Sequence, residues 1–230
     1  MTNQSSPAPT PPPVSLVPLQ SSDELIPLHH RQYEAATFKL NDSSLLLRGA
    51  IRDLKPAGLY VPNDPEPLII HHMQVDLTVN LADFVITDAT VDFIAHPDVT
   101  CPLIVDHYRK LIGVSIARGF GRTIRELFGG PRGCAHTTAL LQAMAPAAIQ
   151  SMWSLSLVDR DGEGAQAMSF ETSEDVERSI ASNLNTCHVW DEAGEHVKLI
   201  RKGDIERRPP LSVIDRLEEL GRAKSEWLDN

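Results

Sequence analysis

The segment Met73-Gln-Val-Asp-Leu-Thr-Val79 alternates apolar and polar side chains without interruption, and it decides the fold. Successive side chains of a strand point to opposite faces, so this period of two predicts a strand with one buried face. Outward from this segment, similar patterns extend from Tyr33 to Ile94 in runs separated by turn residues. The predicted strands cover residues 38–40, 45–54, 68–79 and 84–94. Consecutive strands with short links imply an antiparallel meander.

From Cys101 onward, apolar residues are spaced by three and four, which is typical of amphipathic helices. Glycine and proline interrupt this pattern at Gly113 and over residues 129–133. The predicted helices cover residues 101–111, 117–128, 135–153, 173–184 and 211–228. Segments 186–190 and 196–200 flank a turn-forming sequence, which predicts a β-hairpin. The fold class is therefore α+β, an antiparallel meander followed by a helical block with a C-terminal hairpin and helix.

The length of 230 residues suits one domain with appendages. Six prolines fall within the first eighteen residues, and such a composition cannot bury enough surface to offset the entropy of ordering. We expect a disordered proline-rich tail over residues 1–28, a single α+β domain over 29–205 and a C-terminal helix within 206–230. A proline-rich docking segment also fits the tail, but a plain leader is the simpler interpretation.

The balance of charge excludes several classes of partner. The chain carries 31 acidic and 21 basic residues, a net charge of −10, which repels nucleic-acid phosphates and anionic membranes. No apolar run approaches the ~18 residues of a membrane-spanning helix, and no secretion signal is recognisable. Three cysteines are too few and too odd in number for a disulfide framework. We therefore expect a cytoplasmic protein whose cysteines are free thiols or metal ligands.

Cys134 is the sharpest single candidate for chemistry, because it lies at the start of the predicted third helix. The free N–H groups and the dipole of a helix N-terminus favour an anion there, and Arg132 adds positive charge. A thiolate in this position would serve as a nucleophile or as a metal ligand. The alternative is a small buried cysteine that packs like a hydrophobic side chain.

A metal site is predicted where cysteines and histidines gather at the ends of elements. The candidate ligands are His71, His72, Cys101, Cys134 and His136. Thiolate and imidazole donors suit zinc or iron. Adjacent strand residues point to opposite faces, so at most one of His71 and His72 can turn toward a shared site. His136 would be a ligand or a base, and the sequence leaves open whether Cys187 joins the site.

Chemistry without a metal is the alternative at the same residues. Cys134 or Cys101 would be the thiol nucleophile and a neighbouring histidine, such as His136, its base. Carboxylates for acid–base work are also present, but their spacing favours none of them: Asp53, Asp76, Asp88 and Asp106.

A basic stripe is predicted on the second helix of this acidic chain. Arg118, Arg122 and Arg125 recur at helical spacing, and Arg118 and Arg122 are the candidates for binding the carboxylate or phosphate of a substrate. A solvated helix face is the simpler explanation of the stripe.

Four short motifs resemble those of a bacterial domain family of unknown function. They are His71-His72-Met73, Pro97 to Cys101, Leu111-Ile112-Gly113 and Gly133-Cys134-Ala135-His136. The resemblance covers about residues 29–200. Members of that family are often encoded near catabolic genes, so the resemblance implies a catabolic role.

A more distant similarity is to the NifU/IscU-type iron–sulfur scaffold fold. It rests on the segment 86–91, which leads to Cys101, and on Gly133-Cys134-Ala135 at a helix start. His71 and His72 stand where the first scaffold cysteine belongs, so the donor set would mix imidazole and thiolate. The similarity implies a NifU/IscU-like core, and fold-level analogy does not by itself carry function.

Three functional hypotheses follow. The first is a metal-dependent enzyme, a lyase or hydrolase, that acts on a small organic acid or carbonyl substrate. The second is an iron–sulfur or sulfur carrier, and the third is a non-catalytic partner-binding module with inert thiols. The amphipathic helices 135–153 and 211–228 would also suit a homodimer face, although core packing explains them equally well.

Overall fold

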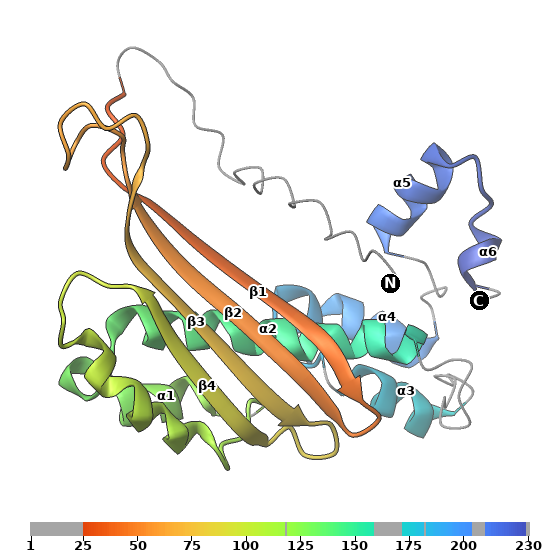
Figure 1. Ribbon diagram of the computed structural model, residues 1–230. Coiled ribbons are helices and arrows are strands. Elements are labelled where there is room, and N and C mark those ends of the chain that lie inside the picture. The colour runs from red at the N-terminus through yellow and green to blue at the C-terminus, as the bar shows by residue number, and fades with distance from the viewer. Residues whose placement is uncertain (1–24, 118, 159–171, 182, 204–209, 229–230) are drawn as a thin grey trace, which may run out of the picture. The chain divides into compact units, whose positions relative to one another are not determined.

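The computed structural model describes residues 25–117, 119–158, 172–181, 183–203 and 210–228 (Figure 1). Most of the predicted tail and Arg118 lie outside these ranges. The chain divides into two compact units, Met1–Leu157 and Val158–Asn230. This division falls within the range 29–205 that we expected to form a single domain.

The first unit is built on a four-stranded sheet. Its strands are β1 (His30–Asn41), β2 (Ser44–Lys55), β3 (Leu68–Asn80) and β4 (Ile86–Ala95). They lie in the order β1-β2-β3-β4, and every neighbouring pair is antiparallel. The predicted meander and the α+β class are therefore confirmed.

The helices of the first unit follow the sheet in the chain. They are the 3₁₀ helix η1 (Cys101–Leu111), α1 (Phe120–Phe128), the short η2 (Gly130–Arg132) and α2 (Ala135–Val158). Figure 1 shows α2 running across one face of the sheet. The segment 101–111 was predicted as a helix, and the structure makes it the tighter 3₁₀ form, which begins with a proline in its first turn.

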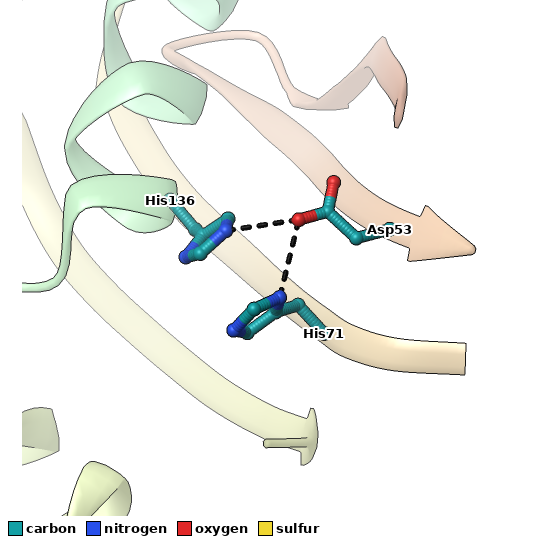
Figure 2. A group of neighbouring side chains, drawn as sticks. All are labelled: Asp53, His71 and His136. Carbon is teal, nitrogen blue, oxygen red and sulfur yellow. Dashed lines mark hydrogen bonds and ion pairs between the residues drawn. The ribbon is translucent and has the colours of Figure 1, made fainter. Parts of the chain in front are cut away.

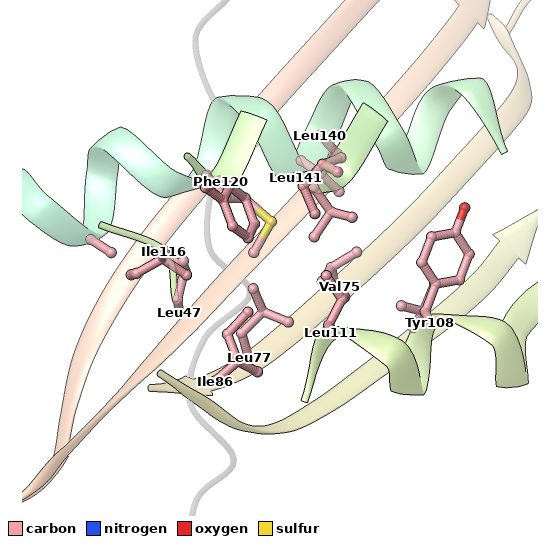
Figure 3. Close-up of a cluster of buried hydrophobic side chains, with 14 of the residues drawn as sticks. Leu47, Val75, Leu77, Ile86, Tyr108, Leu111, Ile116, Phe120, Leu140 and Leu141 are labelled. Atoms are coloured by element: carbon pink, nitrogen blue, oxygen red, sulfur yellow. The ribbon is translucent and has the colours of Figure 1, made fainter. Parts of the chain in front are cut away.

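The core lies between that face of the sheet and α2 (Figure 3). The odd-numbered side chains of β2 and β3 are buried there: Leu45, Leu47, Ile51, Met73, Val75, Leu77 and Val79. All of them except Leu45 share one hydrophobic cluster with four residues of α2: Leu140, Leu141, Met144 and Ala148. Fully burying one Leu or Ile side chain is worth about 1.5–3 kcal/mol, so this layer holds α2 on the sheet.

Gly49 allows the close approach of α2 to β2. A Cβ atom at this position would lie 2.4 Å from the Met144 sulfur. Real Cβ atoms do not come this close to a sulfur, so a side chain here would force the Met144 side chain or the helix to shift. Gly49 is buried like its neighbours in the stripe, and it lacks a side chain there for a steric reason.

The second unit is helical. Its elements are α3 (Ser173–Ile180), η4 (His188–Trp190), α4 (Glu195–Lys202), α5 (Leu211–Glu219) and α6 (Ser225–Leu228). The predicted helix over 211–228 is interrupted near Gly221, which has a positive φ of 66°.

The predicted hairpin over 186–200 is wrong, because this segment forms η4 and α4 instead. Five residues are too few to separate a period of two from a helical period. Two helix signals were present: Glu195 lies in the first turn, and Gly203 ends the helix in the left-handed conformation. Val197 is fully buried and supplies the packing that fixes the helix.

Within the described ranges, no helix has both the length and the apolar character needed to span a bilayer.

Candidate metal centre at the end of the sheet

The buried stripe of the sheet changes from apolar to polar at one end. Along β2, Ile51 belongs to the core and Asp53 is the next residue on the same face. The register pairs Asp53 with His71 of β3 on one side and with Arg31 of β1 on the other. A row of three polar side chains therefore crosses three strands on the α2 side of the sheet.

Asp53 is the centre of this row and is only 1% exposed. The Arg31 guanidinium binds both carboxylate oxygens, with Nε 2.7 Å from Oδ1 and Nη2 2.8 Å from Oδ2. Nδ1 of His71 lies 3.1 Å and Nε2 of His136 lies 2.9 Å from the same Oδ2 (Figure 2). Nε2 of His29 lies 3.3 Å from Oδ1. One buried carboxylate therefore collects an arginine and three histidines.

His136 reaches the row from the first turn of α2. The turn before it is tightly packed, because a Cβ at Gly133 would lie 2.6 Å from the Phe128 carbonyl oxygen. The backbone N–H of Cys134 donates a 2.8 Å hydrogen bond to the hydroxyl of Tyr108, which is buried in the core. These contacts fix the start of α2, and the rings of His136 and His71 stack with centroids 3.9 Å apart.

The electrostatics suit an ionised Asp53 carboxylate beside a neutral His136 imidazole. Burial by itself would raise the pKa of Asp53, but hydrogen bonds and charge from Arg31 outweigh it and hold that pKa well below its usual range. Burial, followed by repulsion from His71, lowers the pKa of His136 below its usual value. A deprotonated carboxylate and neutral imidazoles are the forms that bind metal ions.

Asp53, His71 and His136 each offer one ligand atom, and these atoms lie within 4.8 Å of one another. Two imidazoles and one carboxylate form a donor set that suits zinc or non-haem iron. A search of the described residues for three or more histidine, cysteine, aspartate or glutamate side chains with ligand atoms this close together finds this group.

The structure brings together three of the residues singled out in the sequence. His71 and His136 lie in the group, and Cys134 Sγ lies 3.8 Å from Nδ1 of His136. His72 follows His71 on the strand, and burial and the nearby charge of Arg52 lower its pKa. Neither His72 nor Cys101, which begins η1, belongs to the group among the described residues. Their roles as ligands, and that of Cys134, stay predictions.

The arginine stripe is only partly described. Arg122 forms an exposed ion pair with Glu126, with Nε 2.8 Å from Oε1, and Arg118 lies outside the described residues. Cys187 is an exposed residue of the second unit.

Asp53, Arg31 and His29 were not selected by the sequence patterns. Asp53 was one of four carboxylates among which the spacing made no choice. A signal was available, because Asp53 continues the odd-numbered buried stripe 45–51, where a charged residue needs a partner. Arg31 and His29 carry no such signal, since their proximity depends on how β1 pairs with β2.

Comparison with known proteins identifies a family for this chain but no function. Residues 29–150 match the family described as "Protein of unknown function (DUF2889)". This range holds all of the residues around Asp53 and ends within α2. No curated protein and no solved structure matches the chain significantly.

Proposed function

Since the chain belongs to the DUF2889 family, whose description assigns no function, we propose a function from the geometry of the site. The protein binds one zinc or iron ion through Asp53, His71 and His136, and uses it as a metal-dependent lyase or hydrolase. One observation carries this proposal. Asp53 is only 1% exposed, and its Oδ2 lies 2.9 Å from Nε2 of His136 and 3.1 Å from Nδ1 of His71.

The spacing of these atoms supports the proposal. Ligand atoms about 2.0–2.1 Å from a tetrahedral zinc ion lie about 3.3 Å from one another. The two nitrogens need to move only a few tenths of an ångström away from Asp53 Oδ2 to reach that separation. The two imidazole-to-carboxylate distances are therefore close to those around a bound ion.

The neighbouring groups would orient these ligands. Oδ1 of Asp53 contacts Arg31 and His29, and Oδ2, the proposed ligand atom, also accepts a 2.8 Å hydrogen bond from Nη2 of Arg31. Nδ1 of His136 faces Cys134, so the thiol holds the ring that would bind through Nε2. The positive charge of Arg31 opposes a cation, so its benefit lies in fixing the carboxylate rather than in attracting the ion.

A bound ion would polarise a carbonyl group or activate a water molecule. Three protein ligands leave a coordination position open for a substrate oxygen. The imidazoles of His71 and His136 are 20% and 18% exposed, so a small molecule can approach them. The proposed substrate is a small organic acid or carbonyl compound of a catabolic pathway. We also propose that the protein is cytoplasmic and forms a homodimer.

A thiol enzyme is the second candidate, and one observation favours it. Cys134 Sγ, His136 and Asp53 form a continuous chain, with 3.8 Å between sulfur and Nδ1 and 2.9 Å between Nε2 and Oδ2. This is the order of nucleophile, base and orienting carboxylate in cysteine hydrolases. Without an ion, Asp53 would hold the proton of His136 on Nε2 and leave Nδ1 free to accept the thiol proton.

The iron–sulfur carrier, with its NifU/IscU-like core, is less favoured by the donors present. Clusters of this kind are held mainly by cysteine thiolates. In the described part of the chain, the candidate group contains two imidazoles and a carboxylate.

Elemental analysis of protein purified without a histidine tag tests the proposal. We expect about one zinc or iron ion per wild-type chain after dialysis. The variant His72→Asn should keep this ion, and the variant His71→Asn should bind it at least about tenfold more weakly. His72 is the matched control because it neighbours His71 without belonging to the group. Wild-type protein that takes up neither metal after reconstitution would overturn the proposal.

Two further readouts separate the other candidates. Metal-free protein in which iodoacetamide alkylates Cys134 faster than the exposed Cys187 would favour the thiol enzyme. Visible absorbance with acid-labile sulfide would favour the carrier. Cys134→Ser that keeps its metal would show that the thiol is not a required ligand.

A further inference from the structure

A surface cleft lies between α1 and α2 and shares no residue with the group around Asp53. Its volume is about 360 Å³, within the range of small-molecule sites. Its lining includes Ile116, Phe120, Arg125, Gln142, Pro146 and Ile149. Ile116 and Phe120 also belong to the core beneath α2 (Figure 3), so the apolar floor of the cleft is packed against the core.

Arg125 is the charged residue of this cleft, and it differs from Arg122 on the same helix. Arg122 pairs with Glu126, whereas the Arg125 side chain makes no ion pair or hydrogen bond with any described residue. Its guanidinium lies over Gly121, with a terminal nitrogen 3.6 Å from where a Cβ would stand. In a chain of net charge −10, an unpaired guanidinium beside an apolar cleft is suited to an anion.

The opposite wall of the cleft offers a second polar group. Pro146 lies inside α2 and has no N–H, so the carbonyl of Gln142 lacks its usual helical donor. Gln142 and Pro146 both line the cleft. The lining therefore combines apolar side chains with the polar residue Gln142 and with the Arg125 guanidinium, which has no ion-pair partner among the described residues.

We propose that this cleft binds a small amphiphilic carboxylate, with its apolar body against Ile116, Phe120 and Ile149 and its carboxylate on Arg125. A single planar guanidinium matches a carboxylate in a two-pronged hydrogen bond. The proposal goes beyond the proposed function, because it depends on neither the metal ion nor any residue that would hold it.

A pair of ligands with the same chain length tests the proposal on the full-length protein. Octanoate and octanol differ in charge but share the apolar body. Displacement of the fluorescent anion anilinonaphthalene sulfonate should show octanoate binding at least about fivefold more tightly than octanol. Equal binding of the two, or no binding of octanoate, would overturn the proposal.

Three variants locate the site. Arg125→Gln should weaken octanoate binding about fivefold to tenfold and leave octanol unchanged. Arg122→Gln is the matched control on the same helix and should bind octanoate like the wild type. Gly121→Leu fills the cleft and should weaken both ligands. Octanoate binding that persists in Arg125→Gln and Gly121→Leu would contradict the assignment, and unchanged metal content in all three would keep this result separate from the metal centre.

Discussion

At the scale of single residues, the ionisation of Asp53 should control the acid stability of the metal-free protein. Its folded pKa lies below the unfolded value of about 3.9, so the unfolded chain binds the proton more readily. The stabilisation from Asp53 is therefore fully present above that value and is lost as the pH falls below it. Asp53→Asn should lose about 1–3 kcal/mol at pH 7 and show a flatter decline in stability between pH 5 and 3.

Urea unfolding with a chelator present, at several pH values, measures this effect. Asp76→Asn is the matched control, because Asp76 binds Arg48 with Nε–Oδ1 at 2.8 Å in a more exposed pair. We expect that variant to lose about 1 kcal/mol or less. Parallel pH profiles for wild type and Asp53→Asn would show that the carboxylate does not anchor the cluster.

The candidate site was partly predictable at this scale. Histidine at the head of β3 and at the start of α2 marked His71 and His136, because these residue types are conspicuous at the ends of elements. Aspartate is a common residue, so Asp53 does not stand out by its type. It stands out only by its position, since it follows the odd-numbered buried residues of β2. Arg31 joins only through the register of β1 and β2, which the sequence does not specify.

At the scale of elements, the strand pattern was informative because one face of the sheet is buried and the other is largely polar. The predicted strand 68–79 agrees with β3 to within one residue. The prediction of a hairpin near residues 186–200 was wrong because its short apolar segments fit both the period of a strand and the period of a helix. The capping signals at Glu195 and Gly203 were the better guide to α4.

Packing between elements makes its own prediction at Gly49. Gly49→Ala should cost about 1–3 kcal/mol, because the new Cβ would meet the Met144 side chain. Shortening the partner in the double variant Gly49→Ala/Met144→Ala should recover part of that loss relative to the sum of the single changes. Urea unfolding gives the four free energies of the cycle. Additive losses would mean that α2 does not approach β2 through this glycine.

At the scale of the whole molecule, the family match and the division into units agree on where the proposed chemistry resides. The match ends at residue 150 and the first compact unit at Leu157, while every residue around Asp53 precedes both positions. The second unit has its own buried residues, including Ile180, Val197 and Leu217. The first unit therefore contains both the proposed metal centre and the cleft between α1 and α2.

A chain truncated after Val158 should accordingly keep the metal stoichiometry of the full-length protein and unfold cooperatively. The reason is that the sheet, α2 and their shared core lie within that segment. Calorimetry with elemental analysis checks both properties on the same sample, and the full-length chain is the control. A truncated chain that folds but loses its metal would mean that residues beyond Val158 contribute a ligand. Cys187 and His188 are the residues there to change first, because cysteine and histidine are the donors that zinc and iron accept most readily.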